Sequence, residues 1–348
     1  MAKRAAKTRR LPLLEHVDKQ MARLHENVAV ALETFDEEAV HDTRVATRRM
    51  KAAMDLMMPV LTKQHNKPLA SGLRKLRRRL GPLRDADVMI HHLAKLADDA
   101  RHHDAAGWLR LRLEASREAL RSESKAGASV EKSLRRIATW PMVRAEIGEA
   151  AEAVDCLLAE SLHLQTDAFA EQADRLAADM QGGAALPTGG DRLSAEASRP
   201  RQNPHEVRIA GKALRYTLEM AEAQGHLPGS RLMKLFKRMQ ELLGAWHDWV
   251  VIADACLKEI VAAELTHLDP ARSDQVIDLA KLAVKRSGQE LTGFCRLWNQ
   301  KGGDMAAQIR SSFPLTQSLI QSQTHPDPVA TASPEALQDA ASATEPPA

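Results

Sequence analysis

The sequence predicts an all-α protein made of two similar four-helix bundles. Aromatic residues make up only 3% of the 348 residues, whereas alanine, leucine, arginine and glutamate are abundant. This composition favours helices over the strands of a sandwich or barrel. Apolar residues recur at helical spacing along the chain, and two blocks of sequence repeat in the same order. We therefore expect two bundles related by a pseudo-two-fold axis, with a basic cleft at the centre.

The first half is expected to contain a series of short helices. Pro59 ends the second of them, because proline cannot continue a helix, and Gly81-Pro82 breaks the third. Asp85 and Asp248 each follow a Leu-Gly turn and are interpreted as helix N-caps. The expected helices span residues 13–34, 39–58, 68–80, 85–100, 104–123 and 131–138.

The second half begins with a long, acidic, alanine-rich helix. A flexible loop rich in Gly, Pro, Ser and Ala is expected at 181–203, and further helices follow it. The expected helices span residues 145–180, 204–223, 229–244, 248–264 and 272–299. We divide the chain into a basic N-terminal tail at 1–12, a first repeat at 13–144, a second repeat at 145–310 and a disordered acidic tail at 311–348.

Several classes of protein are excluded. No segment has the run of about 18 apolar residues that a membrane span needs. The basic segment 1–10 lacks the apolar stretch of a secretory signal. Cys156, Cys256 and Cys295 lie far apart in the sequence, which argues against a zinc ribbon or a disulfide scaffold. A reducing cytoplasm is therefore the expected location.

The internal repeat is carried by two pairs of segments. Residues 41–48 (HDTRVATR) are matched by residues 205–212 (HEVRIAGK), at an offset of 164. Residues 80–85 (LGPLRD) are matched by residues 243–248 (LGAWHD), at an offset of 163. Two matches in the same order at nearly the same offset indicate a duplication.

Charge is segregated along the chain, although the formal net charge is only +3. Residues 41–90 contain 12 Lys and Arg against 4 Asp and Glu, and residues 199–240 contain 9 against 3. Between them, residues 149–198 contain 2 against 10, and the tail 314–348 has four acids and no Lys or Arg. Two basic blocks indicate a surface with a strong local potential.

Within each basic block the charges share one face of a helix. In the first block the opposite face carries Ala46, Met50, Ala53 and Met57, which we expect in the core. Stacked like charges destabilise a helix by a few tenths of a kcal/mol per pair, so their presence in both repeats favours an anionic ligand that compensates them. Arginine suits phosphate because its planar fork can bind two oxygens. The predicted anion-binding residues are His41, Arg44, Arg48, Arg49, Lys51, Arg74, Lys75, Arg78, His205, Arg208, Lys212, Arg215, Lys234, Lys237 and Arg238.

Enzymatic alternatives are less well supported by the sequence. Glu160-x-x-His163 and Glu264-x-x-His267 are typical of di-iron bundles, but they do not fall at equivalent places in the repeat. A phosphate-binding loop of the form Gly-x-x-x-x-Gly-Lys-Ser/Thr is absent. We therefore expect no catalytic residues, no cofactor and no metal. A metal-dependent phosphohydrolase or a di-iron bundle is the less favoured hypothesis.

Four motifs together resemble the CHAD family, the conserved histidine α-helical domain, over roughly residues 13–300. They are His41-x-x-Arg44-x-x-x-Arg48-Arg49-x-Lys51, Leu80-Gly81-x-x-Arg84-Asp85-x-Asp87-Val88, His205-x-x-Arg208-x-x-x-Lys212-x-x-Arg215-Tyr216 and Leu243-Gly244-x-x-His247-Asp248. The resemblance implies two four-helix bundles around a basic cavity, binding of inorganic polyphosphate, and association with polyphosphate granules. The Glu-x-Glu-x-Lys signature of a CYTH domain is absent, which indicates a stand-alone member.

The second repeat departs from the family pattern. His247, Val250 and Ala213 stand where the first repeat has Arg84, Asp87 and Arg49, so we expect the second half to bind phosphate less strongly.

The function expected from the sequence is therefore non-catalytic binding of inorganic polyphosphate. Binding of nucleic acid or another polyanion is the alternative, because the same cations suit a phosphate backbone. Single-strand binders usually stack bases on aromatic side chains, however, and Tyr216 is the only aromatic residue in the two repeated basic helices.

Overall fold

The computed structural model describes residues 11–124, 128–182, 202–226 and 229–314, and every regular element in these ranges is a helix. The prediction of an all-α protein is therefore confirmed. Residues 1–10, residues 183–201 of the loop predicted at 181–203 and residues 315–348 of the tail predicted at 311–348 lie outside the described residues. The helices are α1 (Pro12–Glu33), α2 (Glu37–Met57), η1 (Met58–Val60), α3 (Lys63–Leu96), α4 (His103–Ser124), α5 (Ala128–Ile137), α6 (Trp140–Glu149), α7 (Val154–Gly182), α8 (Pro204–Ala223), α9 (Ser230–Ala262), α10 (Leu265–Leu268) and α11 (Pro270–Ser312).

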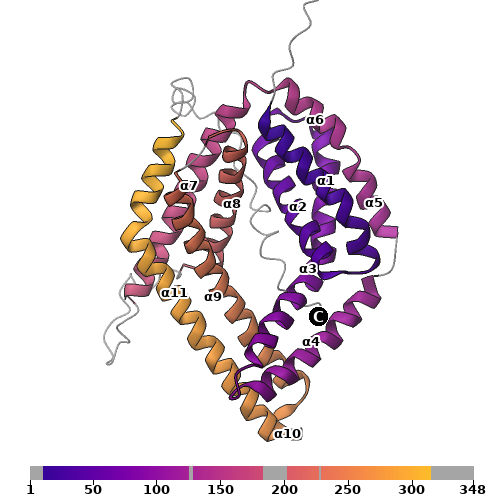
Figure 1. The fold of residues 1–348 in the computed structure, drawn as a ribbon, viewed down its shortest axis with the longest axis vertical. Helices are drawn as coiled ribbons and strands as arrows, with labels where there is room; N and C mark the ends of the chain where they lie inside the picture. Colours follow the sequence, from indigo (N-terminus) through magenta and orange to yellow (C-terminus); the bar gives the residue numbers. More distant parts are fainter. Residues whose placement is uncertain (1–10, 125–127, 183–201, 227–228, 315–348) are drawn as a thin grey trace, which may run out of the picture.

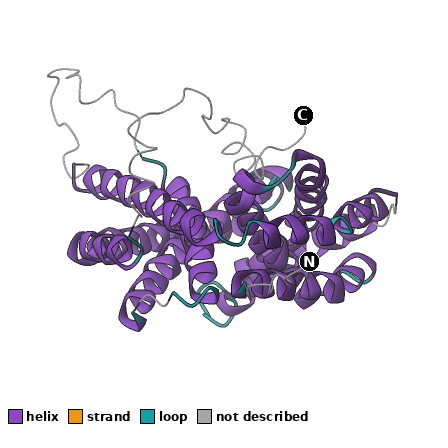
Figure 2. Cartoon of the chain, turned by 90° about the horizontal axis from the view of Figure 1, so that it is seen from above, coloured by secondary structure: helices purple, strands orange, loops and turns teal. Residues whose placement is uncertain are grey.

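The helices form two groups that stand side by side (Figure 1). In one group α2 packs between α1 and α3, and α5 and α6 pack on α3; in the other, α8 packs between α7 and α9, and α11 packs on α7 and α9. The groups touch where α8 lies against α1 and α2, and where α7 lies against α2. The lower ends of α3, α9 and α11 join α4 and α10 at one end of the molecule (Figure 1). Seen from above, the described residues are helices joined by short connections (Figure 2).

Helices α3 and α9 are each continuous, so the predicted breaks at Gly81-Pro82 and before Asp248 are wrong. Pro82 removes one backbone donor, but buried Leu80 and Leu83 continue the apolar face across it, and packing outweighs the local propensity. Asp85 and Asp248 therefore lie in helix interiors, and their interpretation as N-caps is also wrong.

The predicted helix at 145–180 is divided between the two groups. The indole of Trp140 donates to Asp18 Oδ1 at 3.0 Å, and this contact fixes α6 against α1. Helix α7 packs instead on α8 and α11, so the chain has to turn between α6 and α7. A backbone hydrogen bond from Ala153 to Ala150 closes that turn.

The main core runs through both groups. Phe169 lies at its centre in the second group, with ring centroids 5.7 Å from Phe236 and 5.3 Å from Trp298. Ala46, Met50, Ala53 and Met57 are buried as predicted. A smaller apolar cluster fills the end where α3, α4, α9, α10 and α11 meet. In the part of the chain that is described, no helix is long and apolar enough to cross a membrane.

Candidate functional site: a cationic cluster between the two helix groups

Two features set the direction of the basic face of α2: the N-cap that starts the helix and the apolar face that packs in the core. Asp36 accepts a hydrogen bond from the backbone of Ala39 at 2.9 Å and starts the helix. Burial of the opposite, apolar face then turns His41, Arg44 and Arg48 away from the core of their own bundle. Helix α8 begins in the same way, because the side chain of Asn203 accepts from the backbone of His205 at 2.9 Å.

Arg44 is held against the backbone of α3. Its Nη1 donates to the carbonyl of Arg77 at 3.1 Å, and its Nη2 lies 3.6 Å from Asp85 Oδ1. Only 17% of the side chain is exposed. Burial and three neighbouring arginines lower the pKa of this guanidinium from its usual value, whereas Asp85 opposes the shift.

The second group contributes two cations that are buried further. Burial lowers the pKa of Lys212 to about 7, and Arg208, Arg48 and Arg44 reinforce the shift. Burial also lowers the pKa of Arg208, with Arg48 again acting against its charge. Side chains from α2 and α8 are thus close enough to act on one another. We call these four residues, Arg44, Arg48, Arg208 and Lys212, the central cationic cluster.

Few negative charges face the central cationic cluster. Asp85 and Asp248 are the carboxylates that stabilise the charge of Arg208, and Asp248 also pairs with His92 Nε2 at 3.2 Å. Among the residues that the structure describes, Arg48, Arg208 and Lys212 have no carboxylate within ion-pair distance, and Nε of Arg208 is buried without a hydrogen-bond partner. An excess of buried positive charge is costly unless an anion compensates it.

Histidines line the same region. Burial and Arg208 lower the pKa of His247 to about 4, and burial and Arg84 lower the pKa of His41. The ring of His247 lies 5.4 Å from that of His205 and 6.0 Å from that of Trp246. The imidazoles of His41 and His247 therefore add hydrogen-bonding groups rather than further charge at neutral pH, and the rings of His205 and His247 add ring surface.

Besides Arg44, three more of the predicted site residues on α2 and α8 are engaged in ion pairs. Arg49 Nε lies 2.8 Å from Glu219 Oε2, and Arg215 Nε lies 3.0 Å from Glu219 Oε1. Lys51 pairs with Asp55 at 2.5 Å. Because Arg49 is on α2 and Glu219 is on α8, the first of these pairs joins the two helix groups. The sequence did not indicate this role for Glu219.

The remaining predicted cations are exposed on α3 and α9. They are Arg74, Lys75, Arg78, Lys234, Lys237 and Arg238. Lys75 faces α5, because Arg136 is the largest of the charges that lower its pKa, and Lys132 adds to the effect. The structure therefore groups Lys75 with Lys132 and Arg136 of α5, which are not among the cations predicted from the sequence. Arg238 pairs with Glu241 on its own helix.

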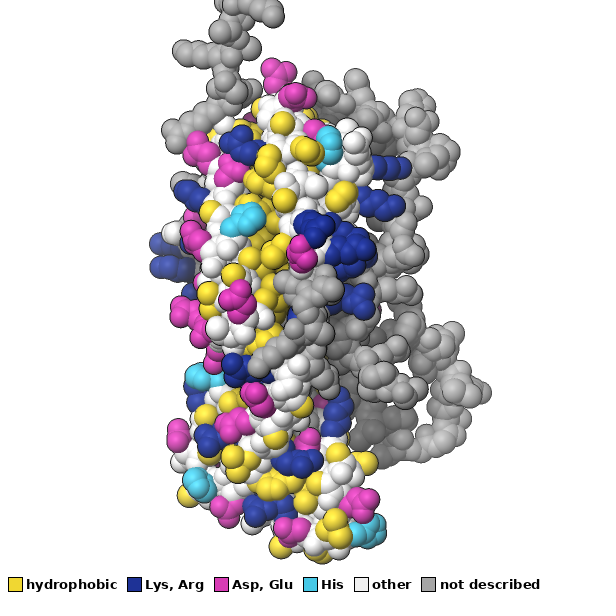
Figure 3. Space-filling view, turned by 90° about the vertical axis from the view of Figure 1, so that its right-hand side faces the viewer, with side chains coloured by type: hydrophobic (Ala, Val, Ile, Leu, Met, Phe, Trp, Pro, Cys, Tyr) yellow, Lys and Arg dark blue, Asp and Glu magenta, His cyan; other side chains and the backbone are white. Residues whose placement is uncertain are grey.

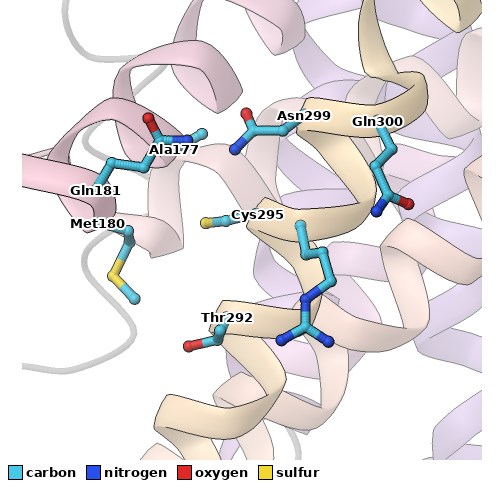
Figure 4. Close-up of a pocket in the computed structure, with 8 residues that line it drawn as sticks. Ala177, Met180, Gln181, Thr292, Cys295, Asn299 and Gln300 are labelled. Atoms are coloured by element: carbon cyan, nitrogen blue, oxygen red, sulfur yellow. The ribbon is translucent and has the colours of Figure 1, made fainter.

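Two surface pockets lie apart from most of these residues. One, of about 350 Å³, opens between the end of α7 and α11, where Met180, Cys295 and Asn299 border it (Figure 4). It contains one charged residue, Arg296, and none of the predicted anion-binding residues. A second pocket borders Arg49 and Glu219. Neither pocket is lined by a residue of the central cationic cluster.

The metal motifs considered from the sequence are not brought together. His163 Nε2 contacts the carbonyl oxygen of Phe313 at 2.7 Å, and Glu264 lies at the turn between α9 and α10, with φ of 48°. Asp87 is buried and pairs with Arg117. Within the described ranges, no group of three or more His, Cys, Asp and Glu side chains is arranged to hold a metal ion.

Comparison with known proteins identifies relatives of most of the chain. A family model described as the CHAD domain matches residues 15–257. The crystal structure of the CHAD domain from the plant Ricinus communis is similar, with a TM-score of 0.50 and 18% identity over 87% of this chain and 90% of that chain. PptA from Streptomyces chartreusis has a TM-score of 0.49 and 16% identity over 83% of this chain and 98% of that chain. The comparison with curated proteins gives no match.

Proposed function

This chain belongs to the CHAD domain family, and from that premise we propose that it binds inorganic polyphosphate at the central cationic cluster. The observation that carries the proposal is the contact between α2 and α8, which brings Arg44 and Arg48 within electrostatic reach of Arg208 and Lys212. Polyphosphate is a flexible chain with about one negative charge per phosphoryl unit. Such a ligand supplies closely spaced charges to cations that have too few carboxylate partners of their own.

Arginine and lysine have different tasks in this proposal. The fork of Arg208 can bind two phosphate oxygens, and its unpartnered Nε is one of the donors available for them. Lys212 acts as a point charge. A phosphate that comes close favours its protonated form and so restores that charge. Arg44 is already aligned by Arg77 and Asp85, so it loses little conformational entropy on binding.

The proposed role is binding without catalysis. The groups that face the ligand are cationic donors and imidazoles, and the two nearby carboxylates, Asp85 and Asp248, act on the charge of Arg208. This arrangement stabilises a bound anion. Turnover assays with polyphosphate, with and without added divalent cations, test this part of the proposal: release of orthophosphate above background would contradict it.

A second candidate is binding of single-stranded nucleic acid, and one observation favours it. The rings of Trp246, His247 and His205 follow one another at the edge of the cluster, with centroids 6.0 Å and 5.4 Å apart. Aromatic rings beside cations are the usual means of binding unpaired bases. This surface was not apparent from the repeated basic helices alone.

Competition at fixed salt distinguishes the two candidates. A fluorescent long-chain polyphosphate is bound to the protein and then displaced with unlabelled polyphosphate, single-stranded RNA or duplex DNA at equal phosphate concentration. We expect displacement by polyphosphate at much lower concentration than by either nucleic acid. Preferential displacement by RNA, reduced by a Trp246→Ala change, would support the second candidate instead.

The thiols of Cys256 and Cys295 are buried, and burial raises their pKa to about 12 and about 11, so neither thiol is reactive.

The ligand also determines the proposed location, which is the cytoplasm and the surface of polyphosphate granules. A fluorescent fusion of the full chain should collect at stained granules. An Arg208→Ala, Lys212→Ala variant should remain diffuse if the cluster is responsible.

A further inference from the structure

A second group of cations lies on the outer side of the first helix group, and a glycine allows it to form. A Cβ on Gly72 of α3 would lie only 3.0 Å from the carbonyl oxygen of Ser133 and 3.1 Å from the Cβ of Arg136, so α5 packs closely on α3 at this point. Arg136 Nη1 also donates to Ser71 Oγ at 3.2 Å. The basic rows of the two helices therefore lie next to each other.

The electrostatics of Lys75 show how close these charges are. Arg136, Lys132, Arg74 and Arg78 all lower its pKa, although the side chain is exposed. Among the described residues, Lys75, Arg78 and Lys132 have no ion-pair partner. Lys and Arg side chains gather at mid-height on the side of the molecule that carries α5 (Figure 3). We call Arg74, Lys75, Arg78, Lys132 and Arg136 the outer patch.

The outer patch shares no residue with the central cationic cluster, but basic residues around α3 connect the two. The charges that lower the pKa of Lys212 come from α2 and α8, and none of them belongs to the outer patch. The carbonyl of Arg77 accepts from Arg44 of α2, and the charge of Arg77 lowers the pKa of Arg44, so Arg77 lies on the side of α3 next to α2. At about 100° per residue, Arg74 and Arg78 fall on the arc of α3 between Arg77 and Lys75. A basic path thus leads from the cluster across α3 to α5.

We propose that the outer patch is a second polyanion subsite, which a polyphosphate chain reaches only when it is long enough to extend from the central cationic cluster around α3. The inference rests on the function proposed above. Helices α3 and α5 carry no Phe, Tyr or Trp, so the patch lacks the rings that bind unpaired bases and suits an inorganic chain better than RNA. Occupation of both subsites by one chain makes affinity depend on chain length.

A Lys75→Gln, Lys132→Gln variant tests the subsite, because both side chains are exposed and make no contact that the fold needs. Its matched control is Lys285→Gln, Lys301→Gln, which removes the same charge from exposed positions on α11 at the opposite edge of the molecule. Binding of tripolyphosphate and of long-chain polyphosphate is measured for all proteins over a range of salt concentration.

The affinity of the outer-patch variant for long-chain polyphosphate should be lower by about fivefold or more. The slope of log K against log salt should be shallower by about 1.5, because binding with two fewer contacts releases fewer counterions. Its affinity for tripolyphosphate should equal that of the wild type, and the control should be unchanged with both ligands. Unchanged long-chain binding, or an equal loss with tripolyphosphate, would overturn the subsite. A loss of RNA binding with polyphosphate binding intact would make the patch a nucleic-acid surface and also overturn it.

The outcomes separate this inference from the proposed function. If the wild type binds neither polyphosphate, the proposed function fails and the subsite fails with it. If the wild type binds both, and an Arg208→Ala, Lys212→Ala variant binds neither while the outer-patch variant binds like wild type, only the subsite is wrong.

Discussion

The guanidinium of Arg44 occupies the space beside Gly81 that a larger residue would fill. A Cβ at position 81 would lie 3.0 Å from Arg44 Nη1, the atom that donates to the carbonyl of Arg77. Gly81 therefore leaves room for the close approach of a side chain and does not break the helix. At Gly244, which the sequence match pairs with Gly81, a Cβ would have nothing within 4 Å. The two sequence-matched glycines thus have different surroundings.

Gly81→Ala and Gly244→Ala should have different effects. Alanine replaces glycine inside a helix with a gain of about 0.5–1 kcal/mol in the free energy of unfolding, provided that there is space. We expect Gly244→Ala to show this gain and to bind polyphosphate normally. Gly81→Ala should gain less, because it displaces Arg44, and should bind polyphosphate several-fold more weakly. Denaturant unfolding and ligand titration of both variants give the measurement; equal affinities would contradict the role assigned to Gly81.

Binding should need cations from both helix groups. Arg44→Ala with Arg48→Ala, and Arg208→Ala with Lys212→Ala, should each weaken polyphosphate binding by tenfold or more, since each charge-assisted contact contributes roughly 1.5–3 kcal/mol. The quadruple variant should lose less than the sum of the two losses, or lose measurable binding, because contacts to one chain share its ordering entropy. Circular dichroism checks the fold. Normal binding by either folded double variant would exclude a shared site.

Glu219 should stabilise the fold through Arg49. Glu219 and Arg49 are 16% and 22% exposed, so Glu219→Gln removes a half-buried charge partner from two arginines. We expect the free energy of unfolding to fall by about 1–3 kcal/mol. The matched control is Asp55→Asn, which breaks the exposed Lys51 pair and should cost at most about 0.5 kcal/mol. Equal stability of the two variants in urea would show that the contact between α2 and α8 contributes nothing.

The sequence predicted the helices and their faces because both depend on local patterns. The buried Met50 and the partly exposed Arg48 follow from helical spacing alone. The continuity of α3 through Gly81-Pro82 could not be predicted, since it depends on packing on both sides of the proline. The prediction that the second half binds phosphate less strongly stays a prediction; among the described residues of that half, Arg208 and Lys212 have no carboxylate within ion-pair distance.

The assignment of single cations depended on contacts between elements distant in the sequence. Arg49 and Arg48 are neighbours on one helix, yet only Arg49 meets a carboxylate from α8. The sequence offered one signal for this difference, because Ala213 replaces Arg49 in the second repeat and cannot form the same pair. Nothing in the sequence placed Lys132 and Arg136 beside Lys75, because α5 has no counterpart among the repeated segments.

The binding of polyphosphate should weaken as the pH rises above 7, and Lys212 gives the reason. Its pKa in the free protein is about 7, because burial and the cations Arg208, Arg48 and Arg44 disfavour its charge, while Asp248 of α9 favours it. A bound phosphate raises this pKa, so at pH 8 the complex takes up a proton that the free protein lacks. Affinity should therefore fall by up to about tenfold per pH unit between pH 7 and pH 9. His41 and His247 have lowered pKa values, so both are neutral throughout this window.

Stability of the free protein should change in the opposite direction over the same window. The unfolded chain keeps Lys212 protonated up to its usual value of about 10.5, so above pH 7 the unfolded state binds more protons than the folded state, and the free energy of unfolding rises with pH. Lys212→Gln removes the titrating group and should flatten both profiles between pH 7 and pH 9; calorimetry in two buffers of different ionisation enthalpy measures the proton uptake directly. If wild-type binding takes up no proton at pH 8, or if Lys212→Gln retains the full pH dependence, Lys212 does not lie against the bound phosphate, and the ligand must be held by Arg44, Arg48 and Arg208 without it.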